Sequence, residues 1–313
     1  MATWTSSASI GQREDLVDVI VRIDPDDTPI FSNAKREVTK AIYHEWQVSE
    51  LASAVDTNYV NEGADFSFTN PNPTTRLGNY HQISVQAAQV SGTLDAVDLA
   101  GRAKESAFVK IQKSLEQRRD IEKALCKNEA RSSSDPRKAG KLMSYITNIN
   151  VISASTTPAG TGADVSDLAG TNAALTLAKI DAAMKLAFED GGQPSMMVVS
   201  PGNKVAFSDL SSGSAVTNQL HMTAPKDATI VGSVSMYLTD FGTLSVTIDR
   251  FSADDRIFLL DPDHYSIGHL PGRMFAVEEV AAVGDATRFA IKSEWTLIMR
   301  APKAHAGVYD LST

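Results

Sequence analysis

The sequence predicts an α+β fold, with strands in the first and last parts of the chain and a mixed helix and strand segment between them. Apolar side chains recur at every second residue in residues 41–48 and 79–90, which is typical of half-buried strands. They recur at helical spacing over residues 94–130. Strands and helices then alternate over residues 139–255, and strand patterns fill the remainder from residue 256.

Composition and charge indicate a soluble folded protein and exclude several classes. The chain has 313 residues, of which 42% are hydrophobic and 21% charged, so it is long enough for a large core and unlike a disordered chain. Its net charge of −9 lacks the basic footprint of a DNA-binding domain. The single cysteine, Cys126, rules out an intramolecular disulfide. We expect no export signal and no membrane association, because no apolar run approaches 18 residues.

Residues 12–23 predict a short amphipathic helical segment near the N-terminal end. Its apolar residues share one helical stripe: Leu16, Val19, Ile20 and Ile23. The turn-forming run at 24–29 ends the pattern. A helix of this length is unstable alone in water, so we expect the stripe to dock on the body or on a partner chain.

Residues 42–90 predict a long two-stranded excursion from the body. The intervening stretch, residues 56–80, holds about 25 residues with two prolines and few that could build a core. An isolated hairpin is marginally stable in water, so something outside it should hold it in place.

Residues 94–130 predict a long helix of about 50 Å that carries charges of both signs. Mixed signs favour protein contacts over phosphate contacts, and a solvated helix face is the alternative explanation. The helix is expected to act as a spine along the molecule.

The rest of the chain predicts an α/β segment followed by strands. Helices are expected at 175–190 and 202–210, and a buried strand at 195–199. Further strands are expected at 142–152 (irregular), 228–238, 244–249, 256–260, 265–270, 275–283, 288–300 and 305–309.

Candidate catalytic and metal sites fail on their context, so no catalytic, cofactor-binding or metal-binding residue is predicted. His44-Glu45 lacks the second histidine of a zinc-protease helix and lies on a strand. Gly160-Thr161-Gly162 lacks the third glycine of a dinucleotide-binding loop. A soluble α/β enzyme that binds a small molecule in residues 140–255 stays open as an alternative.

An ordered set of short segments resembles the major capsid protein of tailed double-stranded DNA bacteriophages. The segments are DDTPIFS (26–32), HEWQ (44–47), EG (62–63), RLGNY (76–80), VSGT (90–93), RRDIE (118–122), VVSP (198–201), DFGTL (240–244), LDP (260–262) and AHAG (304–307). The resemblance spans residues 10–311 and implies the Hong Kong 97-type capsid fold. By this resemblance, residues 1–40 are an N-terminal arm, 41–92 an extended β-hairpin loop, 93–139 with 256–313 a peripheral domain with the spine helix, and 140–255 an α/β axial domain.

The resemblance implies a structural subunit of a phage head. Copies of the chain would assemble in the host bacterial cytoplasm as pentamers and hexamers into an icosahedral capsid that becomes part of the virion. That shell would enclose double-stranded DNA without sequence-specific binding. Portal, separate scaffolding, and cement or decoration proteins are the implied partners. A cellular nanocompartment shell of the same fold, enclosing a protein cargo, is the alternative within this fold.

The subunit interface is expected to involve the arm, the extended loop and the spine helix. On the loop, Trp46 and Tyr59 are predicted apolar anchors, and Glu62 and Arg76 are candidate charge partners. The remaining predicted interface residues are Leu16, Ile20 and Ile23 on the arm and Arg118 and Arg119 on the helix. The alternative for each is packing against its own subunit. Residues 54–79 contain no lysine, which argues against a covalent cross-link with its donor in the loop.

Overall fold

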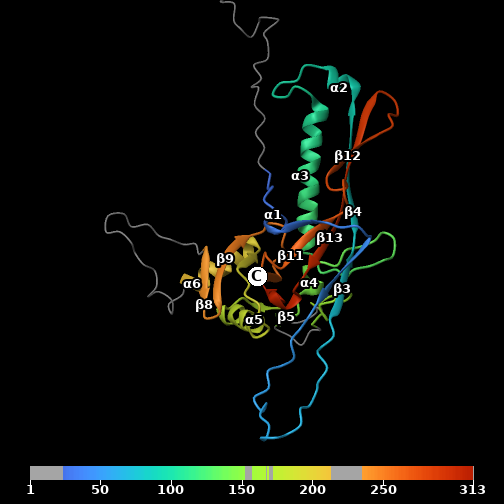
Figure 1. Cartoon of the computed structure of the whole chain (residues 1–313). Helices are drawn as coiled ribbons and strands as arrows, with labels where there is room; N and C mark the ends of the chain where they lie inside the picture. The colour runs from blue at the N-terminus through green and yellow to red at the C-terminus, as the bar shows by residue number, and fades with distance from the viewer. Residues whose placement is uncertain (1–23, 152–156, 167, 169–171, 213–234, 313) are drawn as a thin grey trace, which may run out of the picture.

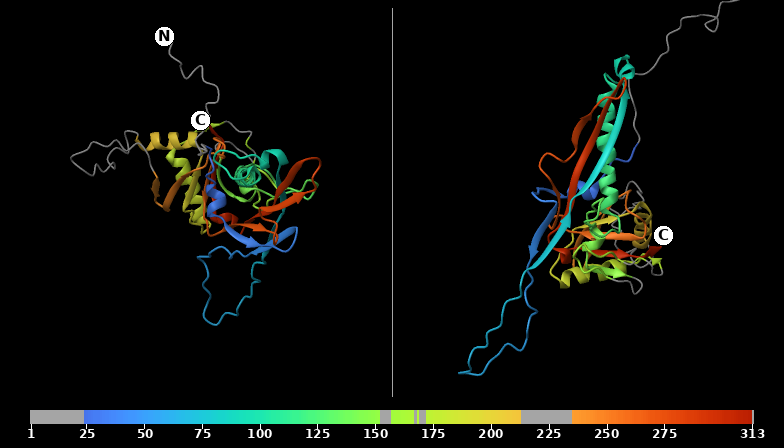
Figure 2. Two further views of the ribbon diagram at one scale, coloured as in Figure 1. Left: turned by 90° about the horizontal axis from the view of Figure 1, so that it is seen from above. Right: turned by 90° about the vertical axis from the view of Figure 1, so that its right-hand side faces the viewer.

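The computed structural model describes residues 24–151, 157–166, 168, 172–212 and 235–312. The chain forms an elongated part and a broader body (Figure 1). In the elongated part, helix α3 (Glu105–Leu125) lies along strands β4 (Gln82–Ser91) and β13 (Ala286–Met299), while the body surrounds a second sheet (Figures 1 and 2). Two sheets combined with helices confirm the predicted α+β class.

The long sheet is organised around β13. Over Ala286–Trp295 this strand pairs antiparallel with β4, and on its other side it pairs with β12 (Ala276–Val280). Its last residues pair with β11 (Tyr265–His269), to which β1 (Lys35–Val38) adds in parallel. The face toward α3 buries the side chains of Val90, Phe289 and Ile291. Burial of one face explains the strict two-residue period of this part of the sequence.

The second sheet has six strands in the order β5-β14-β10-β7-β9-β8. Their bounds are Asn148–Val151, Ala306–Tyr309, Arg256–Leu260, Met196–Val199, Gly242–Ile248 and Met236–Thr239. Helix α5 (Leu177–Glu189) buries Ile180 and Met184 in the apolar cluster of this sheet, and α6 (Pro201–Ser212) adds Phe207. Continuous apolar runs in β7 and β10 correspond to strands buried on both faces, as predicted for 195–199.

Several short elements complete the fold. They are α1 (Pro29–Asn33), β2 (Tyr43–Val48), β3 (Thr75–Tyr80), α2 (Gly92–Ala96), α4 (Leu142–Tyr145), β6 (Ala173–Ala174), the 3₁₀ helix η3 (Pro302–Ala304) and β15 (Leu311–Ser312). Strand β15 pairs with β6, outside both large sheets. The largest buried cluster lies where α1, α3 and α4 meet strands of both sheets.

The spine helix is shorter than the predicted 94–130. Helix α3 has 21 residues, which corresponds to about 32 Å rather than about 50 Å. Residues 92–96 form the separate helix α2, whose Asp95 accepts hydrogen bonds from the backbone N–H and the hydroxyl of Ser106, both at 3.0 Å. Gly101 between the helices has a φ of +76°, which interrupts a right-handed helix. An acidic side chain over the first turn of α3 therefore starts a new helix there.

The predicted strand at 79–90 is two strands. Strand β3 pairs with β2, whereas β4 leaves the hairpin and joins the long sheet. The break falls at His81, whose backbone N–H donates to Ile42 O at 2.9 Å and whose buried ring lies 2.9 Å from the Thr39 hydroxyl. The irregular strand predicted at 142–152 is also wrong in its first half, which forms α4.

The six-stranded sheet combines strands from two of the predicted domains. Strands β10 and β14 belong to the six-stranded sheet, together with the strands of residues 140–255. The resemblance implies that residues 256–313 belong to the peripheral domain, and this division into domains stays a prediction. A sequence pattern shows that a strand exists but carries little information about its sheet, because strand pairing is a long-range property.

Candidate subunit interface

Strands β2 and β3 form a two-stranded hairpin that is fastened to the body at its base. The strands pair antiparallel from Tyr43 opposite Tyr80 to Val48 opposite Thr75. At Gly78 a Cβ atom would lie 2.6 Å from the Tyr43 ring, so any larger residue would require that ring to move. The Gly78 carbonyl accepts hydrogen bonds from the Tyr145 hydroxyl at 3.0 Å and from the Arg131 guanidinium. The glycine in the RLGNY segment therefore serves the hairpin base.

Asn79 connects the hairpin to two segments of the body. The side chain is fully buried; its amide nitrogen donates to Leu297 O at 2.8 Å and to Gly140 O at 3.1 Å, and its oxygen accepts from Gly140 N at 2.8 Å. These three bonds reach β13 and the segment before α4, and the side-chain oxygen also accepts from Tyr80 N at 2.9 Å. The direction in which the hairpin leaves the body is thus set by buried hydrogen bonds.

Lys141 is a buried cation next to this attachment. Its ammonium donates to the Gln82 side-chain oxygen and lies 4.6 Å from the centre of the Trp295 ring. Burial lowers the pKa of Lys141 to about 7, while the nearby Glu129 carboxylate acts in the opposite direction. Sequence analysis did not predict the burial of Lys141, because a single lysine between glycine and leucine looks like a surface residue.

The hairpin loop, residues 49–74, contains no helix or strand and projects beyond the body at the end opposite to α2 (Figures 1 and 2). Six large apolar side chains in it are between 67% and 96% exposed: Leu51, Val55, Tyr59, Val60, Phe66 and Phe68. Its acidic residues include Asp56, Glu62 and Asp65, and it contains no lysine or arginine. Exposed apolar surface of this extent marks an interaction site.

Three of the predicted loop residues lie at the surface. Tyr59 is 80% exposed, and Glu62 is exposed and forms no ion pair within the described residues. Arg76 forms an exposed ion pair with Glu45 at 3.8 Å across the hairpin. Glu62 and Arg76 therefore do not pair with each other within one chain. Phe66 and Phe68 were not singled out from the sequence, although apolar residues in a stretch that cannot build a core are a readable signal.

Trp46 and the two helix arginines contact their own chain. The half-buried Trp46 ring packs 6.0 Å from the Tyr145 ring. Arg118 donates to the Ser32 hydroxyl at 2.6 Å, and the Arg119 guanidinium lies 5.7 Å from the centre of the Phe251 ring. Packing within the subunit is the alternative stated above for these residues, and their role between subunits stays a prediction. Leu16, Ile20 and Ile23 lie outside the described residues.

Glu122 lies in the RRDIE segment, and its burial was not predicted from the sequence. Both carboxylate oxygens accept hydrogen bonds from the first turn of α1, from Ile30 N at 2.7 Å and Phe31 N at 2.8 Å. Burial raises the pKa of Glu122 to about 7. A glutamate in a helix rich in charges looks like part of a solvated face, and its partners lie more than 90 residues earlier in the chain.

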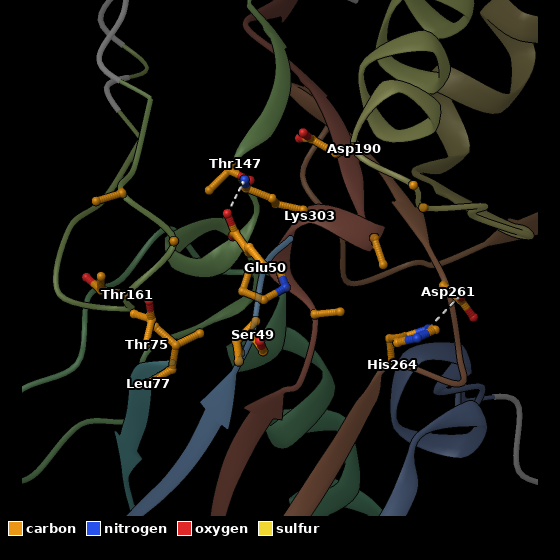
Figure 3. A pocket seen from close by; sticks show the side chains of 18 of the residues that line it. Ser49, Glu50, Thr75, Leu77, Thr147, Thr161, Asp190, Asp261, His264 and Lys303 are labelled. Carbon is orange, nitrogen blue, oxygen red and sulfur yellow. Dashed lines mark hydrogen bonds and ion pairs between the residues drawn. The ribbon is translucent and has the colours of Figure 1, made fainter. Parts of the chain in front are cut away.

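A pocket of about 480 Å³ lies beside the hairpin base, between the ends of β2 and β3, the end of α5 and η3 (Figure 3). Glu50 and Lys303 form an ion pair at 3.0 Å on its wall, and Asp261 and His264 form another at 2.8 Å. The pair between Glu50 and Lys303 braces the start of the hairpin loop against the body.

Two properties of the described residues bear on cofactors and membranes. No group of three or more His, Cys, Asp or Glu side chains in the described ranges is arranged to hold a metal ion. None of the helices within those ranges combines the length and the apolar character required to span a membrane.

Solved structures of phage capsids share this fold over almost the whole chain. The capsid asymmetric unit of cyanophage A-1(L) superposes with a TM-score of 0.70 at 15% identity, covering 99% of each chain. The capsid of a native GTA particle has a TM-score of 0.63 at 12% identity, covering 98% of each chain. The holo-SrpI encapsulin complex of Synechococcus elongatus PCC 7942 has a TM-score of 0.56 at 10% identity, covering 94% of this chain and 92% of that one. The predicted Hong Kong 97-type capsid fold is confirmed.

Sequence comparison identifies the family. The major capsid protein of Escherichia phage Phieco32 is 30% identical over 122 residues, which is 39% of this chain. The match spans 35% of that relative, about a third of its length. The SU10 major capsid protein family model matches residues 3–312. The chain therefore belongs to the SU10 major capsid protein family.

Proposed function

We propose that this chain is the shell-forming subunit of a tailed-phage head, in which copies assemble as pentamers and hexamers into an icosahedral capsid. The observation that carries the proposal is the hairpin loop, with six exposed apolar side chains on a segment that is fastened to the body only at its base. Each exposed aromatic side chain presents about 150–250 Å² of surface. Covering this surface with a second copy supplies a driving force for assembly.

The acidic character of the chain supports a container role. The net charge of −9 is opposite in sign to the excess of basic residues that phosphate tracking requires, so packaged double-stranded DNA would be enclosed without sequence-specific binding. The proposed location is the virion, after assembly in the host bacterial cytoplasm. Portal, scaffolding, and cement or decoration proteins are proposed partners; a phage G capsid structure of the same fold contains gp26 decoration proteins.

The role is proposed to be structural and not catalytic. Membership of a capsid protein family supports it, because such a subunit acts by packing against its neighbours. The two pairs on the wall of the pocket hold the side chains of Glu50, Lys303, Asp261 and His264 in contacts within the subunit (Figure 3).

Electron microscopy of particles formed by the full chain tests the proposal. Replacing Phe66 and Phe68 together by serine should abolish closed shells while the temperature of thermal unfolding stays unchanged, since both side chains are exposed. Val205→Ser on α6 removes a side chain that is 63% exposed outside the loop and serves as the matched control. Normal shell yield from the double variant would overturn the loop as the driver of assembly.

A nanocompartment shell is the second candidate, and the likeness to the encapsulin complex favours it. Particles isolated from the native source distinguish the two functions. Nuclease-protected double-stranded DNA inside them supports the phage head, whereas a stoichiometric protein cargo without DNA supports the nanocompartment.

A further inference from the structure

Glu122 attaches α1 to the spine helix through a carboxylate without a cation. The side chain is 0% exposed and takes part in no ion pair within the described ranges. Its two oxygens bind the consecutive backbone N–H groups of Ile30 and Phe31. These are among the first N–H groups of α1, which have no partner within the helix. This buried carboxyl group therefore adds to the other contacts between α1 and α3, which are the Arg118–Ser32 hydrogen bond and the apolar packing of the two helices.

The charged and titratable groups around Glu122 come from four elements. On α3, the Arg118 cation lies one turn before it and Cys126 one turn after it. After β9, the Asp249 carboxylate accepts from Cys126 Sγ at 3.2 Å and from Phe251 N at 2.8 Å. On β11, the Tyr265 hydroxyl donates to Ile30 O at 3.1 Å. On β10, the Arg256 guanidinium donates to Cys126 O at 2.9 Å, away from the Glu122 oxygens.

These surroundings favour a protonated Glu122 while α1 is docked. Burial is the largest influence and raises the pKa of Glu122 to about 7; the negative charge of Asp249 acts in the same direction. The two backbone N–H groups and Arg118 oppose it without prevailing. Burial raises the pKa of Asp249 as well, so two carboxyl groups share one poorly solvated region.

Separating α1 from α3 would expose Glu122 to water and restore its ordinary pKa of 4.5. The docked form therefore binds the proton more tightly than the undocked form, and by linkage protons favour docking. The docking advantage is complete below pH 4.5 and is lost as the pH rises through about 7. The difference corresponds to a change of roughly 300-fold in the docking equilibrium.

We propose that Glu122 and α1 form a proton-dependent latch, which holds the chain before β1 against the spine helix at acidic pH and loosens as the pH rises through neutrality. Both α1 and β1 lie within the predicted arm, residues 1–40, and the chain continues from α1 into β1 of the long sheet. The latch therefore controls how firmly the arm is connected to the subunit, which is a property separate from shell formation itself.

Amide hydrogen exchange on the full chain tests the latch. Between pH 5 and pH 8, after correction for the intrinsic exchange rate, protection of the amides in residues 30–34 should fall by roughly 70-fold, since part of the roughly 300-fold change lies below pH 5. Protection of the central β13 amides should not change over that range. Light scattering at each pH ensures that a single assembly state is compared. Protection of residues 30–34 that is constant or rises with pH would overturn the proposal.

Three variants separate a latch from a merely structural contact. Glu122→Gln keeps one acceptor oxygen but does not titrate, so protection should become independent of pH, whatever its level. Glu116→Gln, an exposed glutamate on the same helix, should keep the wild-type dependence. Asp249→Asn removes the neighbouring negative charge and should move the midpoint to lower pH. An unchanged dependence in Glu122→Gln overturns the proposal, and should that variant not fold, an unchanged midpoint in Asp249→Asn does so.

Discussion

The side chain of Asn79 binds both backbone groups of Gly140, accepting from its N–H at 2.8 Å and donating to its carbonyl at 3.1 Å. The same amide nitrogen also donates to Leu297 O. One buried side chain thus unites the hairpin base, the segment before α4 and the central strand of the long sheet.

Replacing Asn79 should loosen the hairpin and lower global stability. Asn79→Ala leaves the N–H of Gly140 and the carbonyl of Leu297 buried without these partners, so we expect the free energy of unfolding to fall by about 2–4 kcal/mol. Urea denaturation of the full chain measures this change. Asn61→Ala, in the exposed loop, is the control and should stay within about 0.5 kcal/mol of wild type. A comparable loss in both variants would contradict the role of Asn79.

Replacing Trp46 should affect mainly the stability of the subunit, whereas replacing Tyr59 should affect mainly assembly. Trp46→Ala removes a half-buried ring packed on Tyr145 and should lower the free energy of unfolding by about 2 kcal/mol. Tyr59→Ala removes an exposed side chain, so it should leave unfolding within about 0.5 kcal/mol of wild type and reduce shell yield. Thermal unfolding and particle counting on the same preparations compare the two. Equal stability of both variants would show that Trp46 does not anchor the hairpin to its own body.

Two buried histidines should make the fold sensitive to acid. Burial lowers the pKa of His81 and of His305 to about 4, so the folded state binds their protons less tightly than the unfolded state. The free energy of unfolding is unaffected by these rings above pH 6.5. It decreases as the pH falls toward 4, by about 3 kcal/mol for each ring. Glu122 makes the free energy of unfolding rise as the pH falls over an overlapping pH range. The effect of a histidine is therefore measured as the difference between a variant and the wild type at each pH.

The measurement is the free energy of unfolding of His305→Asn minus that of wild type, followed from pH 7 to pH 4. This difference should move in favour of the variant as the pH falls, because asparagine does not titrate. His264→Asn, at a half-exposed ring, serves as the control. A difference that stays constant with pH would contradict the assignment to His305.

Protease accessibility should report whether the hairpin loop is covered. Chymotrypsin should cut the unassembled subunit after Tyr59, Phe66 or Phe68, because these residues lie in exposed chain without secondary structure. Trypsin should spare residues 49–74, which contain no lysine or arginine. In assembled shells the chymotryptic cleavage should be suppressed at least tenfold. Equal cleavage rates before and after assembly, followed by mass spectrometry, would show that the loop stays uncovered.

The hairpin and most strands could be predicted because each strand carries its alternating apolar pattern within its own residues. A two-residue period and a stretch unable to build a core were enough to identify the hairpin and its loop. The start of α3 was predicted wrongly because the apolar residues keep helical spacing across the break between α2 and α3. The Asp95 side chain binds Ser106 in the first turn of α3, and this contact cannot be recognised from the spacing. The sheet to which β10 belongs was not predicted, because its neighbours β7 and β14 lie about 50 residues away on either side.

The interface prediction was limited in the same way, because contacts between residues far apart in the chain could not be predicted. Tyr59 is accessible, as expected of a contact residue, because no core lies near it in the sequence. Trp46 has the same apolar character but meets Tyr145, about 100 residues later in the chain. Glu122 escaped notice because its partners are backbone N–H groups, which leave no trace in residue identities. Side-chain chemistry could be read from the sequence, whereas the direction of each side chain required the fold.

Strand β13 connects the two ends of the long sheet through one continuous strand, which makes this part of the subunit stiff. It pairs with β4 and β12 along its first part and with β11 along its last, so one uninterrupted backbone runs from the distal tip into the base. Bending the tip against the base within the plane of the sheet would have to break main-chain hydrogen bonds rather than slide side chains past one another. A force applied near α2 is therefore transmitted to the far end with little loss. The compliant element is the hairpin loop, which can change shape without disturbing either sheet.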